Sequence, residues 1–195
     1  MRHFVLAAAL LAPAALHAQS TIAAATQGME RRDGFVPVYW SAAKGRLYVE
    51  VPRTGEDFLY LRALATGLGA GGPDIDRGRV GDEAIVRWER SGNRVLLVQQ
   101  NHRFTASAGT PALARSVRES FPTAVLASLE VVAEEGGRLV ADATPLVTSD
   151  ALDLRGELRE NGEGTFVVDP ARSTVWMERT RAFPRNTGLE GAVTF

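Results

Sequence analysis

The sequence predicts a mainly β protein: an antiparallel sheet or a sandwich of hairpins, with one or two short helices. Three observations lead to this fold class. Short runs rich in β-branched and aromatic residues recur along the chain. Tight turns separate them, and a helical spacing of apolar residues occurs in only two places. With 45% hydrophobic residues in a chain of 195, one domain with a packed core is expected.

The first predicted hairpin joins FVPVYW (residues 35–40) to RLYVEV (46–51). Gly45 lies in the connecting loop, where a positive φ is needed. In EAIVRWER, three apolar residues alternate with more polar ones, which predicts a strand with one wetter face. Further strands are predicted at residues 57–64, 83–90 and 93–100, the last two joined by the turn at Ser91–Asn93.

The period changes at Pro111–Ser120, where Leu113, Val117 and Phe121 recur every four residues and predict a helix. A second helix is expected after Thr144, which precedes Pro145 as an N-cap would. Its apolar positions are Val147, Ala151, Leu154 and Leu158. The remaining predicted strands are residues 124–133 and 138–143, which form a hairpin, and then 164–169, 174–180 and 192–195.

The first 18 residues read as a secretory signal peptide, with Arg2 in the n-region and an apolar stretch from Phe4 to Leu16. This stretch is shorter than the ~20 residues of a membrane span. We therefore expect a secreted or periplasmic protein without a membrane span. The expected organisation is a signal peptide at 1–18, a short linker at 19–27 and a β-rich domain at 28–195.

The net charge and the low numbers of cysteine and histidine argue against nucleic-acid binding and against a catalytic zinc site in this chain. The formal net charge is −1, which gives no electrostatic case for binding nucleic acid. The chain has no cysteine and three histidines, of which only His102 lies outside the predicted signal peptide. A catalytic zinc site usually takes three protein ligands, and an HExxH helix needs two histidines. We expect no catalytic residue and no cofactor in this chain.

Two loop motifs fit ligand-binding patterns poorly. GLGAGG (residues 67–72) matches GxGxxG, but Pro73 follows where a helix should begin, so a surface loop is the favoured interpretation. Carboxylates spaced two apart can share calcium, which makes Asp74, Asp76 and Asp82 weak candidate ligands. Because the spacing departs from the EF-hand pattern, an ordinary turn is favoured over calcium.

Other residue groups have a binding and a structural interpretation. His102 follows a strand, and no GxSxG elbow is present to place a nucleophile beside it, so a surface histidine is favoured. The Arg-rich stretch Met177–Arg185 is interpreted as a solvated strand edge rather than a carboxylate-binding surface. At strand spacing, aromatic residues favour core and cross-strand pairs over a binding face; these are Tyr39, Trp40, Tyr48, Phe58 and Tyr60.

The order of several stretches, however, resembles a known family. These stretches are GFVPVYWSAAKGRLYVEV, DRGRVGDEAIVRWERSGNRVLLVQQ, VRESFPTAVLASLEVVAE and VDPARSTVWMERTRAFPRNTG. Together they resemble, over residues 28–195, the N-terminal domain of unknown function of bacterial secreted zinc-dependent metalloproteases. In that family the HExxH peptidase domain lies further downstream. The resemblance implies a zinc metallopeptidase as the parent protein, and it assigns no catalytic residue to this chain.

Two functions remain open from the sequence. The first is a non-catalytic accessory domain that packs on, or controls access to, a downstream peptidase domain beyond Phe195. Its candidate partner contacts are the expected terminal strand, Ala192, Val193, Thr194 and Phe195, and the loop at residues 67–78. The second is a free-standing secreted module that binds a peptide, glycan or apolar ligand on its aromatic hairpins.

Overall fold

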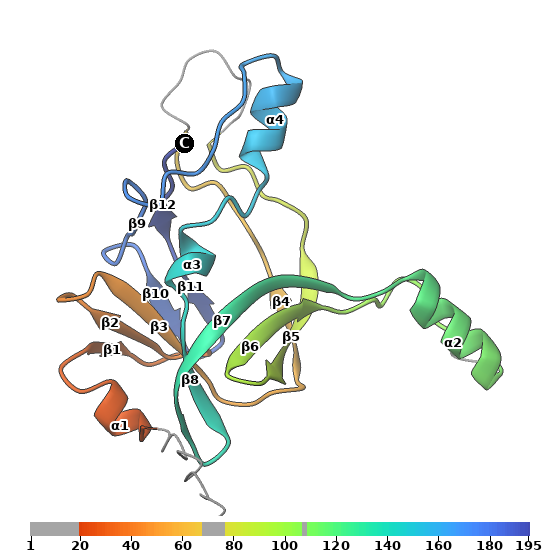
Figure 1. Ribbon diagram of the computed structural model, residues 1–195, viewed down its shortest axis with the longest axis horizontal. Helices are drawn as coiled ribbons and strands as arrows, with labels where there is room; N and C mark the ends of the chain where they lie inside the picture. The colour runs from red at the N-terminus through yellow and green to blue at the C-terminus, as the bar shows by residue number, and fades with distance from the viewer. Residues whose placement is uncertain (1–19, 68–76, 107–108) are drawn as a thin grey trace, which may run out of the picture.

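The computed structural model describes residues 20–67, 77–106 and 109–195. An eight-stranded antiparallel sheet in the order β1-β2-β3-β8-β7-β6-β5-β4 dominates this part of the chain (Figure 1). Its strands are β1 (Glu30–Arg32), β2 (Val38–Ser41), β3 (Arg46–Val51), β4 (Asp57–Tyr60), β5 (Ala84–Ser91), β6 (Arg94–Gln99), β7 (Ala124–Glu135) and β8 (Arg138–Asp142). The predicted mainly β fold of antiparallel hairpins is confirmed.

The hairpins lie where the residue pattern predicts them. β2 and β3 pair around a turn in which Gly45 has φ +61°, as expected for its position. Along β5, Ala84, Val86 and Trp88 are buried while the residues between them are exposed or half-buried. This alternation gives the sheet one apolar face and one wetter face.

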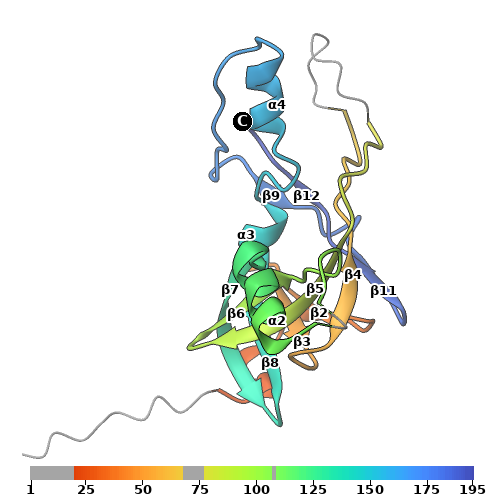
Figure 2. The ribbon, with the colours of Figure 1, turned by 90° about the vertical axis from the view of Figure 1, so that its right-hand side faces the viewer.

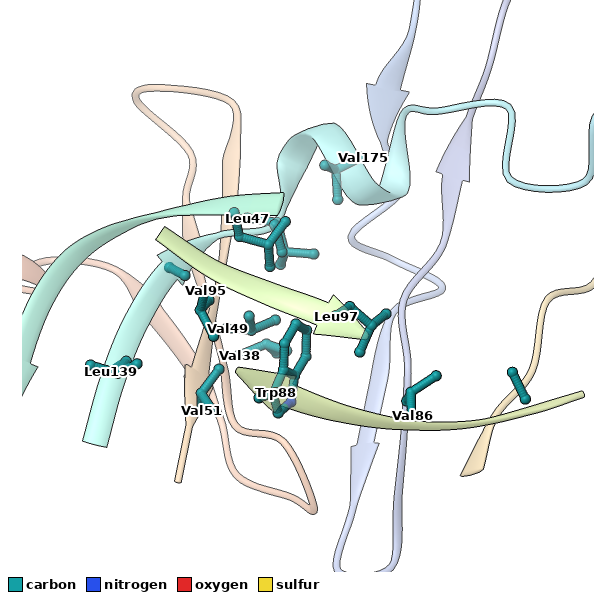
Figure 3. Packing of buried hydrophobic residues seen from close by; sticks show 14 of the residues in the cluster. Val38, Leu47, Val49, Val51, Val86, Trp88, Val95, Leu97, Leu139 and Val175 are labelled. Carbon is teal, nitrogen blue, oxygen red and sulfur yellow. The ribbon is translucent and has the colours of Figure 1, made fainter. Parts of the chain in front are cut away.

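The sheet curls around its apolar face because β7 bends. β7 pairs with β6 through its first half and with β8 through its second half, and its register shifts at Val131/Ala133 and at Leu97/Val98. Such bulges bend a strand and increase its twist. The curl brings β2 and β3 opposite β5 and β6, so their side chains share one core (Figure 3). Its fully buried members include Val38, Leu47, Val49, Val51, Val86, Val95, Leu97 and Leu129.

The opposite face of the sheet carries a smaller cluster under helix α1 (Ile22–Ala25). Ile22 is buried there against Tyr39, Tyr48 and Val140. α1 falls within the segment that the sequence assigns to a linker. Its Ile22 is therefore part of the packed structure.

Helix α2 (Pro111–Ser120) has the bounds that the sequence predicts. The Thr110 hydroxyl caps it by accepting the Leu113 N–H at 3.3 Å. α2 stands away from the sheet at the end of the 100–124 excursion (Figure 1), and none of its residues is buried.

The single helix predicted after Thr144 is wrong, because two helices form, α3 (Thr144–Val147) and α4 (Leu154–Glu160). Thr144 is the first residue of α3 rather than its cap, and its hydroxyl accepts the Leu47 N–H at 2.9 Å. The carboxylate of Asp150 accepts the Leu154 and Arg155 N–H groups at 2.8 and 3.1 Å. These bonds begin a new helix at Leu154.

The C-terminal region also differs from the prediction. No strand forms at residues 164–169, and the strands predicted at 174–180 and 192–195 shrink to β9 (Thr174–Val175) and β12 (Gly191–Ala192), which pair. β10 (Arg181–Phe183) and β11 (Asn186–Gly188) form a second small ladder. These ladders lie beside the curled sheet, and Val175 and Met177 complete its core.

Candidate functional site

A cleft of about 1080 Å³ opens between segments that are far apart in the sequence. One wall is β4 with its continuation to Gly67, and the other is residues 185–195 together with residues 146–158. Figure 2 shows the first wall rising beside the part that carries α4 and the C-terminus. The volume slightly exceeds the usual range for ligand sites, roughly 300–1,000 Å³.

The floor of the cleft is aromatic. The rings of Phe35 and Phe58 meet edge to face with centroids 5.8 Å apart, and Phe58 lies 5.8 Å from Trp88. Figure 3 shows Trp88 among the core residues Val38, Val49 and Leu97. The cleft therefore reaches down to the main core of the protein.

Two buried polar atoms of residues that line the cleft have no hydrogen-bond partner among the described residues. Trp88 is only 6% exposed, and its indole N–H donates to no acceptor within the described residues. The Nε–H of Arg62, which also lines the cleft, is in the same condition. Buried donors in native proteins are almost always satisfied, so two buried N–H groups without a protein acceptor set this floor apart from the rest of the core.

The β4 wall presents an unpaired strand edge. Leu64 N–H donates to Arg79 C=O and Gly81 N–H donates to Arg62 C=O, both at 2.8 Å. In an antiparallel ladder, the residues between hydrogen-bonded positions direct their backbone groups to the other side. The backbone groups of Leu61 and Ala63 therefore point away from this ladder, and they have no partner among the described residues.

The opposite wall is built in the same way. Glu190 C=O accepts the Trp176 N–H at 2.8 Å, and Thr194 C=O accepts the Asp169 N–H at 2.7 Å. In both bonds the carbonyl of the terminal segment points towards residues 169–176. Gly191 and Val193 lie between the bonded positions, so their backbone groups point to the other side.

The two walls meet at one end. Leu64 and Phe195 pack on the buried Leu154 and Leu158 of α4. Arg79 forms an ion pair with Glu157, and Arg62 donates to Ala151 C=O at 2.9 Å. The cleft is closed there by apolar and charged contacts.

The charges at the cleft are mostly engaged. The carboxylate of Asp150 accepts the Leu154 N–H at the start of α4, and its other oxygen forms an ion pair with Arg155 Nε at 3.1 Å. The carboxylate of Glu190 forms an ion pair with the guanidinium of Arg179, with N and O 3.2 Å apart. Burial raises the pKa of Tyr60 above its ordinary value, so its hydroxyl stays protonated and can donate. The remaining lining is largely apolar.

The predicted partner contacts lie in this region. Ala192 is exposed, and Val193, Thr194 and Phe195 are half-buried in the cleft wall. They do not form the predicted strand AVTF, since only Ala192 belongs to β12. Their role as partner contacts stays a prediction.

The calcium candidates are only partly visible. Asp74 and Asp76 lie outside the described residues, as does most of GLGAGG, whereas Asp82 is exposed. Among residues 20–67, 77–106 and 109–195, no three His, Asp or Glu side chains gather in a way that could hold a metal ion. The calcium site stays a prediction.

His102 lies on the surface beside an existing ion pair. Its Nε2 is 3.4 Å from Asp57, to which Arg87 already donates at 2.7 Å. The hydrogen bond from Arg87 holds the pKa of Asp57 below its ordinary value. This position agrees with the surface interpretation of His102.

The aromatic residues of the first hairpins divide between the two faces of the sheet. Tyr39 and Tyr48 are buried as a cross-strand pair on the α1 side. Trp40, Phe58 and Tyr60 are half-buried against the main core, and of these Phe58 and Tyr60 also line the cleft. The predicted cross-strand and core role holds, and two of the five also contribute to the candidate site.

The Arg-rich stretch is mostly a turn followed by β10. Arg179 lies 4.1 Å above the ring of Trp176 and pairs with Glu190. Arg181 donates to Thr180 C=O at 2.9 Å. These arginines stabilise the C-terminal ladders rather than forming an open cationic patch.

A second, smaller cavity of about 340 Å³ lies between α1 and the sheet. Beside it, Tyr39 Oη donates to Glu50 at 2.5 Å and Arg138 donates to the same carboxylate at 2.9 Å. Burial and the neighbouring Glu50 raise the pKa of Tyr39 to about 12. Every charged group of this network has a partner, which is typical of a structural network.

The apolar face of α2 is a further exposed surface. Leu113 is 51% exposed, and Phe121 stacks on Phe104 with ring centroids 3.9 Å apart. Val117 lies between Leu113 and Phe121 on the same face. Opposite it, Arg115 and Glu119 form an ion pair at 3.9 Å.

A family model for a domain of unknown function, DUF5117, matches residues 78–195. This chain belongs to the DUF5117 family. The matched region holds β5–β8 and α2–α4, while β2 and β3, outside it, supply Val38, Leu47 and Val49 to the same core. The folded unit of this DUF5117 protein therefore extends beyond the match on its N-terminal side.

No curated protein and no solved structure matches the chain. In the described part of the DUF5117 protein, no helix is long and apolar enough to cross a bilayer.

The sequence did not reveal the cleft as a site. Its floor and walls combine residues such as Phe35, Leu61, Trp88 and Leu189, which no local motif connects. The apolar spacing of α2 was visible in the sequence, but the spacing alone could not show that the face is left uncovered.

Proposed function

We propose that this DUF5117 chain is a non-catalytic accessory domain of a secreted zinc-dependent metallopeptidase. It packs on the catalytic domain or controls access to it, and zinc belongs to that domain. The resemblance in order and spacing over residues 28–195 supports the link to the peptidase. The family match at residues 78–195 supports the domain assignment alone.

The uncovered apolar face of α2 is the observation that carries the docking role. Isolated helices shorter than ~12–15 residues are marginal in water, and α2 has 10 residues, none of them buried. Its face of Leu113, Val117 and Phe121 continues onto Phe104 through ring stacking. Exposed apolar surface of this kind marks protein–protein contact sites.

The partner that fits this face is a folded domain with an apolar groove. α2 lies inside the matched region, so the helix is part of the family domain. Arg118 in the last turn and Arg103, 5.5 Å above the Phe104 ring, flank the face. The groove of the peptidase domain would accordingly have an acidic rim.

The test begins with the gene, in which the reading frame is followed past codon 195 to an HExxH motif. The peptidase domain is expressed separately, and its affinity for this chain is measured by calorimetry. Leu113→Asp and Val117→Asp should each weaken binding by at least about tenfold, since a charge would be buried in an apolar contact.

The matched control is Ala112→Asp, which places the same charge on the solvent side of α2. It should bind like the unchanged chain. A frame without HExxH, or a peptidase domain that binds all variants equally or none, would refute the accessory role.

The cleft favours a second candidate, a free-standing secreted binding module for a peptide, glycan or apolar ligand. A stop codon after Phe195 together with a saturable change in Trp88 or Trp176 emission on adding cell-envelope fractions would support it. Absence of any such change would count against it.

A further inference from the structure

We propose that the cleft binds an extended polypeptide segment with apolar side chains, which adds as a strand to the free edge of β4. This rests on the second candidate function and deepens it by naming the ligand class of the cleft, and it needs neither a peptidase nor the α2 face. Three features of the described residues support it: the strand edge, the opposite wall and the unpaired indole.

The free edge is the first feature. Leu61 and Ala63 direct their N–H and C=O groups away from the ladder with Arg79–Gly81, and both residues line the cleft. An unpaired row of backbone groups is a template for another strand. The main-chain bonds of such an added strand supply affinity largely independent of its sequence.

The opposite wall is the second feature. Gly191 and Val193 direct their backbone groups away from the ladder with β9, and they line the same cleft. A chain lying between the walls can therefore find donors and acceptors on both of its edges. Only an extended polypeptide offers alternating N–H and C=O groups along two edges at once.

The third feature is the indole of Trp88. It is buried in the floor of the cleft with its N–H unpaired among the described residues. Because the indole nitrogen has almost no accessible surface, a peptide carbonyl would accept this hydrogen only after the neighbouring side chains of the floor move aside. The Nε–H of Arg62 is covered to the same extent.

The chemistry of the lining favours a peptide over a glycan. A glycan needs several polar side chains to hold its hydroxyls, and in the cleft Asp150 and Glu190 are already engaged, whereas Glu163, Arg185 and Asn186 have no side-chain partner among the described residues. Phe35 and Phe58 pack on each other and on Trp88. The apolar floor instead suits the side chains of a strand that alternate towards it.

The test uses the full chain labelled with ¹⁵N and a blocked hexapeptide of alternating valine and threonine. A fully N-methylated hexapeptide of the same sequence lacks every backbone N–H donor, and a glucose hexasaccharide is the glycan probe. The hexapeptide should shift the Trp88 indole resonance saturably and slow amide exchange at Leu61 and Ala63. The N-methylated peptide and the hexasaccharide should do neither.

A pair of variants isolates the edge. Leu61→Pro removes one edge N–H while keeping a backbone that edge strands accept, whereas Leu61→Ala keeps the N–H. Hexapeptide affinity should fall about tenfold or more in Leu61→Pro and stay within about threefold in Leu61→Ala. If Leu61→Pro loses its dispersed spectrum, Ala63→Pro tests the next edge position in the same way.

The proposal would be overturned by equal binding of the hexapeptide and its N-methylated form, or by a shift of the Trp88 resonance by the hexasaccharide alone. Failure of the hexapeptide to bind at all would overturn it as well. Leu113→Asp, which alters only α2, should bind the hexapeptide normally. Loss of peptidase docking and loss of peptide binding are therefore separable.

Discussion

Buried polar groups have hydrogen-bond partners on one side of the curled sheet, whereas on the other side two of them have none among the described residues. Under α1, the carboxylate of Glu50, which is 3% exposed, receives hydrogen bonds from Tyr39 and Arg138. On the cleft side, Trp88 and Arg62 hold N–H groups that bind nothing among the described residues. A completed network stabilises the fold, whereas an incomplete one leaves free energy available for binding. The comparison separates a structural site from a candidate functional one.

The largest effect is expected at the completed network. Glu50→Ala would leave the buried Tyr39 hydroxyl without an acceptor and remove the nearer of the two carboxylate partners of Arg138, which should cost about 3 kcal/mol of unfolding free energy. Urea denaturation measures this, with Glu50→Gln as the milder control because it keeps an acceptor. A loss below about 1 kcal/mol would mean that the α1 side is not the stabilising side.

The wall of the cleft should be less sensitive, though still specific. A Cβ at Gly191 would lie 2.5 Å from Val147 C=O, so Gly191→Ala should push α3 away and cost about 2 kcal/mol. At Gly188 the nearest atom would be 3.9 Å away, and Gly188→Ala should be nearly neutral. Thermal unfolding of both variants compares them, and equal midpoints would contradict the close packing of this wall.

Alkaline pH should weaken the α1 side selectively. The folded pKa of Tyr39, about 12, exceeds its ordinary value of 10.0. The contribution of the protonated Tyr39 hydroxyl to the free energy of unfolding is therefore fully present below pH 10 and is lost as pH rises towards 12. Relative to Tyr39→Phe, the unchanged chain should lose on the order of 1 kcal/mol across this window. Unfolding curves at several pH values would show parallel declines if Tyr39 were not involved.

The smallest effect on stability is expected at α2. Leu113→Asp alters an exposed side chain on a helix without buried residues, so the free energy of unfolding should change by no more than about 0.5 kcal/mol. Urea denaturation of the isolated chain measures this. A loss above about 1.5 kcal/mol would show that α2 packs on its own domain, and the docking proposal would lose its surface.

Local patterns predicted what depends on local physics. The alternation in β5 and the four-residue spacing after Pro111 in α2 predicted a strand and a helix where they lie. The break before α4 was missed because it depends on the side chain of Asp150 reaching forward to two N–H groups. The cleft was missed because its walls come from opposite parts of the chain.

The order of the strands also constrains how the protein folds. β4 to β8 are neighbours in the chain and in the sheet, apart from the α2 excursion, so their pairing closes mostly short loops. β3, in contrast, pairs with β8, which lies far along the chain. The pair of Tyr48 and Asp142 can form only after the residues up to Asp142 are available. During synthesis the β2–β3 hairpin leaves the ribosome before β4 to β8. Its pairing with β8 can form only after these later strands have been synthesised. Folding of the whole sheet should therefore be limited by this one long-range closure, and a chaperone would meet the protein with the edge of β3 still open.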